Sequence, residues 1–297
     1  MNDRKQHVIK MAHQLFINKG FQATSIQDIL EYSGISKGTF YNYFSSKNEL
    51  LKALFKSIYK KMEKDRNELL IGQDPSDIEI LIKQFELQLN TNKKNKLFTL
   101  FEEVLISSDV ELKQYFKEGQ LRMLRWTYQR FLEIFGEDKK PYLLDCAIMF
   151  LGILHQNMKY YAMGHDHTSI EQVVRYTVNR IEKIVYEVAV SNEQLNEPEL
   201  LDKWLPDQLK SNSSFHKNLN EVVVALKKNV SEHKDQPKYL ELLDFVQDEV
   251  VHPKPPRRFL IESALISLNE DPSIFNQQLL SQLEQLVTSQ LQKQGNK

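Results

Sequence analysis

Residues 24–55 (TSIQDILEYSGISKGTFYNYFSSKNELLKALF) constrain the fold of this chain more than any other stretch. They predict three short helices separated by two tight breaks. The first break is Tyr32–Ile35, and a short glycine-containing turn between two short helices is the helix-turn-helix signature. Gly34 can take a positive φ there without a Cβ clash, and Ser36 is expected to cap the helix that follows. Ser46–Glu49 has the spacing of a capping box that begins the third helix.

The second of these helices, residues 36–43, has an unusual composition. Phe40 and Phe44 are its clear core candidates, whereas its other side chains are mostly hydroxyls, an amide and a lysine. So short a helix buries little apolar surface. Hydroxyl, amide and ammonium groups are those that bond phosphate oxygens and base edges. The helix is therefore predicted to read duplex DNA.

The individual roles follow from side-chain chemistry. Lys37 and Lys47 supply charge for phosphates, and the positive amino-terminal dipole of the helix that starts at Lys47 adds to the attraction for a phosphate there. Tyr41 and Asn42 are the expected base readers, and Asn42 prefers adenine. The alternative for Tyr41 and Tyr43 is packing on the first helix. The full set of candidate DNA contacts is Thr24, Ser25, Ser36, Lys37, Gly38, Thr39, Tyr41, Asn42, Tyr43 and Lys47.

Residues 4–55 resemble the DNA-binding domain of the TetR family of transcriptional regulators. The matching positions are Gly20-Phe21, Thr24, Ile29, Gly34 through Tyr41, Tyr43-Phe44, Lys47 and Glu49-Leu50-Leu51. The resemblance implies that Lys37, Gly38, Tyr41, Tyr43 and Lys47 touch operator DNA. Position 42 varies among relatives. The resemblance also implies a homodimer and a helical domain that binds a small-molecule effector.

Charge is distributed unevenly along the chain. Residues 1–64 hold 11 lysines and arginines against 5 acidic residues, whereas the remainder holds 28 against 35. A positive end on a negative body suits a protein that presents that end to a polyanion. Solvated basic helices are the alternative explanation.

Several other classes of protein are disfavoured. The single cysteine, Cys146, precludes an internal disulfide and suits a reducing cytosol, and no apolar leader follows Met1, so we expect a cytoplasmic protein without a secretion signal. The longest apolar run, 142–154, is too short and polar to span a membrane. No catalytic or cofactor motif is present, so neither an enzyme nor a cofactor is expected. His165-Asp166-His167 lacks further metal ligands, and solvated loop groups explain it better.

The remaining chain also predicts helices only, which makes the fold class all-α. Residues 1–48 form the expected head, and residues 47–71 form a helix connecting it to an effector and dimerisation domain at 75–192. The helices expected in that domain are 76–91, 95–107, 110–135, 141–163 and 168–192.

The last two of these helices carry broad apolar stripes. Members of the stripes are Leu143, Leu144, Ala147, Ile148, Leu151 and Leu154, and Val173, Val174, Val178, Ile181, Ile184, Val185 and Val188. In the family that the head resembles, this helix pair forms a dimer interface. The alternative is that both stripes are core within one chain.

A small-molecule effector is expected, but its identity is unknown. An aromatic-lined cavity would suit a flat or apolar molecule. The candidate pocket residues are Phe98, Phe101, Trp126, Tyr128, Phe150, His155 and Tyr160. Aromatic residues at helical spacing are more often core than pocket.

Residues 197–297 form an additional helical module, expected to contain helices at 199–210, 215–231, 236–250, 257–268 and 272–293 with a break at Ser211–Ser214. Two functions follow. The first is a homodimeric repressor released from operator DNA by an effector. The second is a DNA-anchored adaptor whose additional module binds a protein partner without small-molecule control. Activation or repression, the operator and the regulated genes are not specified by the sequence.

Overall fold

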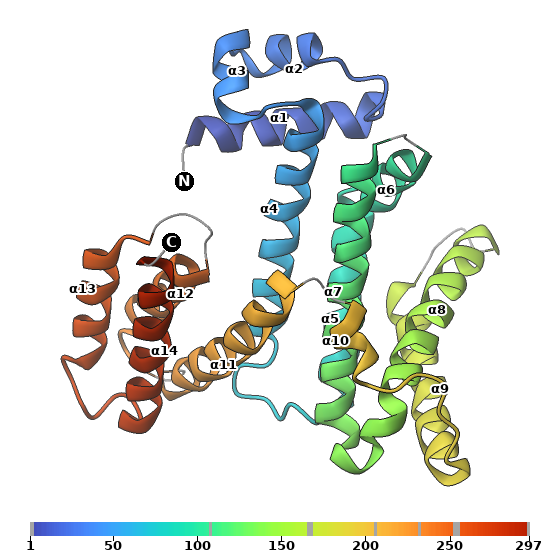
Figure 1. Cartoon of the computed structure of the whole chain (residues 1–297), viewed down its shortest axis with the longest axis vertical. Helices are drawn as coiled ribbons and strands as arrows, with labels where there is room; N and C mark the ends of the chain where they lie inside the picture. The colour runs from blue at the N-terminus through green and yellow to red at the C-terminus, as the bar shows by residue number, and fades with distance from the viewer. Residues whose placement is uncertain are drawn as a thin grey trace. The chain divides into compact units, whose positions relative to one another are not determined.

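A computed structural model describes residues 3–106, 109–164, 169–204, 207–230, 233–251 and 256–295. Throughout these ranges the regular structure is helical, with no strand, which confirms the all-α expectation. No helix among the described residues is both long and apolar enough to cross a bilayer. The chain divides into two compact units (Figure 1). Unit 1 comprises residues 1–66 and 76–204, and unit 2 comprises residues 67–75 and 205–297.

Unit 1 begins with a head of three helices followed by a long fourth. The helices of the unit are α1 (Asp3–Lys19), α2 (Ile26–Ser33), α3 (Lys37–Tyr43), α4 (Lys47–Glu68), α5 (Ile78–Lys94), α6 (Leu97–Ile106), α7 (Val110–Phe135), α8 (Lys140–Gly164), α9 (Ile170–Ser191) and α10 (Leu200–Trp204), with a short 3₁₀ turn Glu137–Lys139 before α8. The predicted helices of the head and of the effector domain match these bounds within about three residues.

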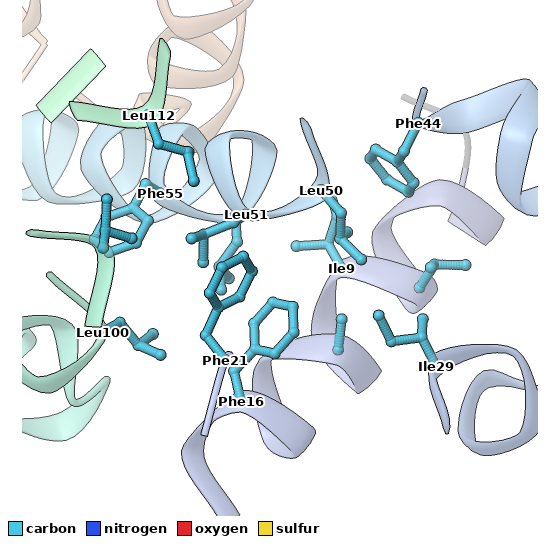
Figure 2. Close-up of a cluster of buried hydrophobic side chains, with 14 of the residues drawn as sticks. Ile9, Phe16, Phe21, Ile29, Phe44, Leu50, Leu51, Phe55, Leu100 and Leu112 are labelled. Carbon is cyan, nitrogen blue, oxygen red and sulfur yellow. The ribbon is translucent and has the colours of Figure 1, made fainter. Parts of the chain in front are cut away.

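An apolar cluster fills the head. Phe16 and Phe21 pack edge to face at 5.1 Å, which closes the end of α1. Ile29 from α2, Phe40 from α3 and Leu50 from α4 are fully buried beside them. Figure 2 shows Phe16, Ile29 and Leu50 converging from separate helices, which is why three short helices hold together.

The head cluster does not stop at α4. Leu100 of α6 and Leu112 of α7 are buried in the same cluster (Figure 2). Phe116 of α7 is buried there too, and its ring lies 4.6 Å from that of Phe55. A polar contact adds to it, because the main-chain N–H of Gln22 donates to Glu103 at 3.0 Å. The expected boundary at residue 48 is therefore bridged by continuous packing.

The second apolar cluster of unit 1 joins α5, α7, α8 and α9. Phe85, Phe131 and Phe150 are fully buried at its centre. Most of the stripes expected on α8 and α9 face this cluster: the buried members are Leu143, Leu144, Ala147, Leu154, Val173, Val174, Val178, Ile181 and Val185. These residues are core within one chain, which was the alternative given for them. A dimer would have to use the other faces of the two helices.

Unit 2 contains α11 (Asp207–Asn229), α12 (Gln236–Val251), α13 (Arg258–Asn269) and α14 (Gln277–Gly295). Its core includes Val223, Leu243, Leu268 and Leu283, and Lys227 forms an ion pair of 2.6 Å with Asp244. One sequence expectation was wrong here, the break at 211–214. Residues 205–206 of the helix expected at 199–210 lie outside the described residues, and the rest of it from residue 200 on falls in α10 and at the start of α11; the break expected at residues 211–214 lies inside α11. None of those four polar residues is glycine or proline, so the helix can continue through them.

Candidate nucleic-acid interface

The turn between α2 and α3 is set by two caps and a glycine. Ser36 has extended backbone, and its hydroxyl accepts from the main-chain N–H of Thr39 at 3.1 Å, so it caps α3 as expected. Gly34 ends α2 in the left-handed conformation with φ +65, and a Cβ there would meet nothing within 4 Å. Glycine is thus needed for its conformation and not for space.

Helix α3 has one buried side chain and a broad exposed face. Phe40 is fully buried and is 5.7 Å from the ring of Phe44, so these two side chains anchor the helix. Lys37, Gly38 and Asn42 are exposed, and Tyr41 is 47% exposed although its ring packs edge-on against Phe40. A cation, an amide, a phenol and a bare backbone therefore share the outer side of a firmly held helix.

Tyr43, Thr39 and Ser36 lie at the margins of that face. Tyr43 is half-buried and packs against the head cluster, and its carbonyl accepts from the Lys5 ammonium at 3.2 Å. The hydroxyls of Thr39 and Ser36 are 2.9 Å apart and bond each other. The packing alternative given for Tyr43 is thus present in part, because the side chain is partly buried against the head cluster.

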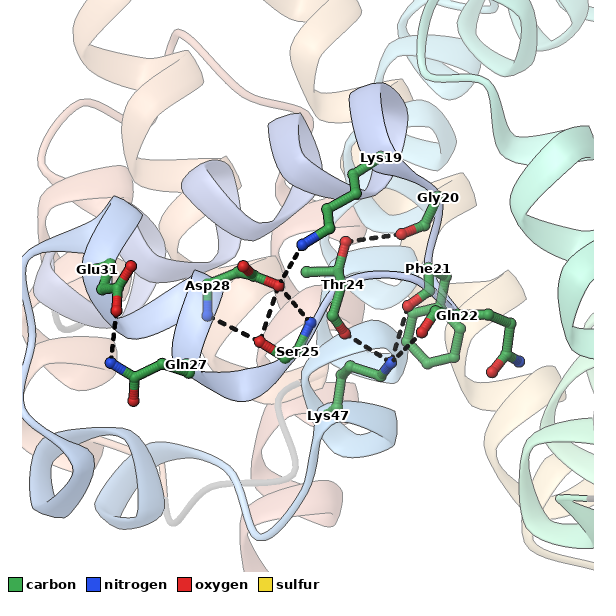
Figure 3. Close-up of polar contacts among 10 residues, drawn as sticks. All are labelled: Lys19, Gly20, Phe21, Gln22, Thr24, Ser25, Gln27, Asp28, Glu31 and Lys47. Atoms are coloured by element: carbon green, nitrogen blue, oxygen red, sulfur yellow. Dashed lines mark hydrogen bonds and ion pairs between the residues drawn. The ribbon is translucent and has the colours of Figure 1, made fainter.

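Thr24 and Lys47, two of the candidate residues, direct their polar atoms into the head. Thr24 is 1% exposed, and its hydroxyl donates to the Gly20 carbonyl at 2.6 Å. The Lys47 ammonium donates to the carbonyls of Phe21 and Thr24, each at 2.8 Å (Figure 3). Burial lowers the pKa of Lys47, and the charges of Glu103 and Asp28 oppose that shift. Both side chains hold the loop before α2. Neither the Thr24 hydroxyl nor the Lys47 ammonium is directed outward toward a phosphate.

A second polar network, not anticipated from the sequence, begins α2. Ser25 and Asp28 form a reciprocal capping box, and Lys19 forms an ion pair of 2.7 Å with the same carboxylate (Figure 3). The hydrogen bonds from Lys19 and Ser25 hold the pKa of Asp28 well below its usual range. The signal was present in the sequence as a serine followed three residues later by an acid. The capping box expected at Ser46 is half formed, since the Glu49 carboxylate pairs with Lys52 instead.

The candidate pocket residues do not gather in one place. Phe150 is core, 4.7 Å from Phe85. Phe101 packs on Phe116 at 5.3 Å beside the head cluster. The set also includes a half-exposed pair, Phe98 and His155, with ring centroids 6.5 Å apart, and a largely exposed Tyr160.

Trp126 and Tyr128 complete the set. Trp126 lies 5.1 Å from Phe85, and Tyr128 is partly buried at the edge of the same cluster. Burial raises the pKa of Tyr128. The structure therefore does not bring these seven residues together around one aromatic cavity. Trp126 differs from the others in that the guanidinium of the buried Arg66 lies over its ring.

The histidines considered as metal ligands, His165 and His167, lie outside the described residues. Within the described ranges no group of three or more histidine, cysteine or acidic side chains is placed to hold a metal ion. The one cysteine, Cys146, is buried and free, and burial raises the pKa of its thiol to about 12.

Comparison with known proteins bears directly on this head. Residues 8–54 match the family described as bacterial regulatory proteins, tetR family. The chain is 31% identical over 280 residues to YerO of Bacillus subtilis, which is named an uncharacterized HTH-type transcriptional regulator, with 90% of each chain covered. It is 25% identical over 300 residues to YuxN of the same organism, with 92% of this chain and 94% of the relative covered.

A third relative is similar only in the head. The HTH-type transcriptional repressor KstR2 of Mycobacterium tuberculosis is 32% identical over 56 residues, which cover 19% of this chain and 28% of the relative. The alignments to YerO and YuxN, by contrast, leave out no more than a tenth of this chain, so they include most of the last hundred residues. The similarity to those two proteins therefore extends over most of the residues of unit 2. No solved structure matches the chain.

Proposed function

The chain belongs to the TetR family of bacterial regulatory proteins and is a DNA-binding transcriptional regulator, and we propose that it acts in the cytoplasm as a homodimeric repressor that a small molecule releases from its operator. The observation that carries this proposal is the outer face of α3, where Lys37, Tyr41 and Asn42 stand exposed on a helix anchored by buried Phe40. The proposed role is binding and requires no catalysis.

The proposed DNA contacts follow from exposure. Lys37 bonds a phosphate, Gly38 lets the α3 backbone approach the groove wall, and Tyr41 and Asn42 meet base edges. Ser36, Thr39 and Tyr43 bond phosphates at the margins, whereas the Ser25 hydroxyl is engaged with Asp28 at the start of α2. Thr24 and Lys47 act indirectly, because their polar atoms hold the loop that positions α2.

A dimer is proposed because one short helix contacts too few base pairs for useful affinity. Two copies of α3 about 34–36 Å apart would enter successive major grooves. Exposed apolar side chains on the outer faces of α8 and α9 support this arrangement. They are Ile148, Tyr160, Met163, Tyr176 and Val190, which are 37%, 64%, 74%, 55% and 84% exposed. Patches of this kind mark interaction surfaces.

Effector release is proposed to act through α4. Leu50, Leu51 and Leu54 at its start are buried in the head cluster, and Arg66 near its other end bonds Gln88 of α5 at 3.0 Å. A ligand that prefers one tilt of α4 over another would change the spacing of the two recognition helices.

The central experiment compares DNA retention by the wild-type chain with that by the double variant Lys37→Ala and Tyr41→Ala. Sequencing of DNA retained by the purified wild type identifies an operator, and a gel-shift titration measures affinity for it. We expect the double variant to lose about 10²-fold or more, because each contact contributes about 1–3 kcal/mol and a dimer makes it twice. Lys61→Ala, which removes an exposed charge on α4, is the control.

Size-exclusion chromatography with light scattering then tests the dimer. Ile148→Glu together with Tyr160→Glu should give a monomer that binds the operator weakly, while the double variant of α3 should remain dimeric. Unchanged operator binding by the α3 variant would refute the proposed DNA contacts. An unchanged dimer in the α8 variant would exclude that face.

A second candidate function is the DNA-anchored adaptor. It is favoured by exposed apolar side chains on α13, where Phe259 is 84% and Ile266 is 67% exposed seven residues further along the same face. In the full-length chain, Phe259→Ser with Ile266→Ser should then abolish repression in cells without changing operator affinity in vitro. Retained repression would argue against the adaptor.

A further inference from the structure

Charged and amide side chains lie buried inside the helical domain of unit 1, where apolar side chains would be expected. Arg66 on α4, Gln84 on α5 and Arg130 on α7 are 8%, 0% and 2% exposed. Arginine and glutamine are rarely buried to this extent without specific partners. What these three bond, and what they leave unbonded, therefore needs a physical account.

Gln84 connects the two arginines. Its amide nitrogen donates to the main-chain carbonyl of Arg66 at 2.9 Å, and its carbonyl oxygen accepts from Nε of Arg130 at 3.0 Å. One turn further along α5, Gln88 accepts from Nη1 of Arg66 at 3.0 Å and directs its own amide at the sulfur of Met123. Side chains four residues apart share one face of a helix, so α5 presents a polar line to the two guanidinium groups.

The two guanidinium groups remain incompletely bonded. Nε of Arg66 and Nη2 of Arg130 are both buried, and neither has a hydrogen-bond partner among the described residues. A buried donor without an acceptor is destabilising, and such cases are few in native structures. Here two occur in one small cluster, on the same kind of group.

The cluster also holds more positive than negative charge. Arg130 is paired with Glu133 on its own helix, whereas Arg66 has no carboxylate within ion-pair distance in the part of the chain that the structure describes. Burial lowers the pKa of Arg66 to about 10; the charge of Glu63 opposes this shift, and that of Arg130 adds to it. The nearby positive charge of Arg130 therefore acts on Arg66 directly, and an added anion would relieve both groups.

The surroundings of Arg66 are otherwise aromatic. Its guanidinium lies over the ring of Trp126, 3.7 Å from the ring centroid, and Trp126 lies 5.1 Å from Phe85. The stacking accounts for part of the stability of a buried cation. Stacking uses the face of the guanidinium and leaves its edge, where Nε lies, available to an acceptor. An apolar ring and a cationic donor therefore lie next to each other.

We propose that this cluster recognises an anionic effector: an organic acid whose charged oxygens accept from Nε of Arg66 and Nη2 of Arg130 while its apolar body packs beside Trp126 and Met123. This inference rests on the proposed function, because it names the chemical class of the effector. Carboxylate, sulfate and phosphate heads share the required acceptor chemistry, and the carboxylate matches two single donors with its two oxygens.

The place of Arg66 on α4 explains why binding there would affect DNA. Arg66 lies in the last turn of the helix that begins at Lys47, directly after α3. At 1.5 Å per residue the two positions are ~28 Å apart along one continuous helix. An anion bound to Arg66 therefore acts on the end of α4 opposite the recognition helix.

The test measures binding to the full-length protein without DNA. Trp126 and Trp204 are the only tryptophans of the chain, so in a Trp204→Phe background the fluorescence reports on the ring stacked on Arg66. The probes are decanoate and 1-naphthoate, with decyl sulfate to compare head groups and decanamide as the neutral match. We expect saturable fluorescence changes with the acids and at least tenfold weaker binding of the amide.

Two variants make the test specific. Arg66→Met keeps an apolar stem and removes the charge, and it is expected to fold because it eliminates an unpaired buried cation. It should weaken acid binding at least tenfold. Arg122→Met, on α7 where it pairs at 4.0 Å with Glu118, removes the same charge outside the cluster and should leave binding unchanged.

Each result decides the inference separately from the proposed function, which the operator gel shift tests. Equal binding of amide and acid, no saturable response to any acid, or undiminished acid binding by Arg66→Met would overturn the anionic site while leaving the repressor intact. Binding of decanoate and decyl sulfate alike would support an anion site of broad head-group preference. Acid binding that is lost in Arg66→Met, in a protein that binds no operator, would support the site and refute the repressor.

Discussion

Two polar regions of unit 1 contrast with each other: the outer face of α3 and the cluster around Arg66. On α3, polar side chains face solvent, where water satisfies them until DNA arrives. Around Arg66, polar side chains are enclosed, and water cannot satisfy the two free donors. Polar side chains exposed to water change the folding free energy little, so they point to a function only through their pattern. A buried donor without an acceptor lowers the stability of the fold by itself. The second region is thus stronger evidence for a ligand, although the sequence does not reveal it.

The largest effect is expected for the anchor of the exposed face. Phe40→Ala removes a fully buried ring and should lower the free energy of unfolding by about 3–5 kcal/mol. Tyr41→Ala, the adjacent exposed residue, should change it by less than about 0.5 kcal/mol while weakening operator binding. Urea denaturation and a gel shift measure the two quantities. Equal destabilisation by both changes would contradict the inside-outside division of α3.

A comparable loss is expected in the buried region. Gln84→Leu leaves the Arg66 carbonyl and Nε of Arg130 without their partner, so we expect a loss of about 2–4 kcal/mol in the free energy of unfolding. The exposed Gln27, which bonds Glu31 on α2, is the matched control, and Gln27→Leu should change stability by less than about 0.5 kcal/mol. If the two glutamines proved equivalent, burial would not distinguish the regions.

The glycines of the recognition segment should behave in opposite ways. Gly34→Ala forces a Cβ into the left-handed conformation and should cost about 1–2 kcal/mol. Gly38→Ala adds a methyl group on a helix, where its nearest neighbour, the Ser36 hydroxyl, is 3.9 Å away, and should stabilise folding by about 0.5–1 kcal/mol, yet weaken operator binding by blocking close approach. Thermal unfolding and gel shifts separate the two. Undiminished operator binding by Gly38→Ala would argue against a close approach of that backbone.

The smallest effect is expected at Asp28. Because its folded-state pKa lies below the ordinary value of 3.8, the carboxylate stabilises the fold above about pH 4, and this contribution is lost as the pH falls through the folded-state pKa. Asp28→Asn should therefore be slightly less stable than wild type near neutral pH, and the difference should shrink under acid. Urea titrations at about pH 7 and about pH 2 measure it. A difference that grew under acid would contradict the ion pair with Lys19.

The head could be derived from sequence because its signals are local. A glycine at a turn, a serine before a helix and alternating buried positions each act over three or four residues, so Gly34, Ser36 and Phe40 were identified correctly. Thr24 and Lys47 show the limit of that reasoning. Their side chains have the chemistry of phosphate ligands, but the fold of the loop supplies closer acceptors.

Beyond the head, local sequence signals predict helices but not what those helices pack against. The stripes on α8 and α9 correctly predict helices, but periodicity does not tell whether a stripe meets its own chain or another. The break expected within α11 failed because polar residues without glycine or proline interrupt a helix only when the tertiary structure allows. Residues 97–116, expected in the effector domain alone, contribute to the head core because packing ignores sequence distance.

The sequence by itself determined that the chain is all-helical, that a helix-turn-helix head begins it, and that α3 carries polar side chains on a short helix. Each of these follows from the order of neighbouring residues. Only the tertiary structure decided that Arg66, Gln84 and Arg130 meet in an apolar interior, because they come from three helices and their burial depends on what each helix packs against. Hydrogen bonding and desolvation depend on proximity in space, which sequence spacing does not encode beyond a few turns of helix.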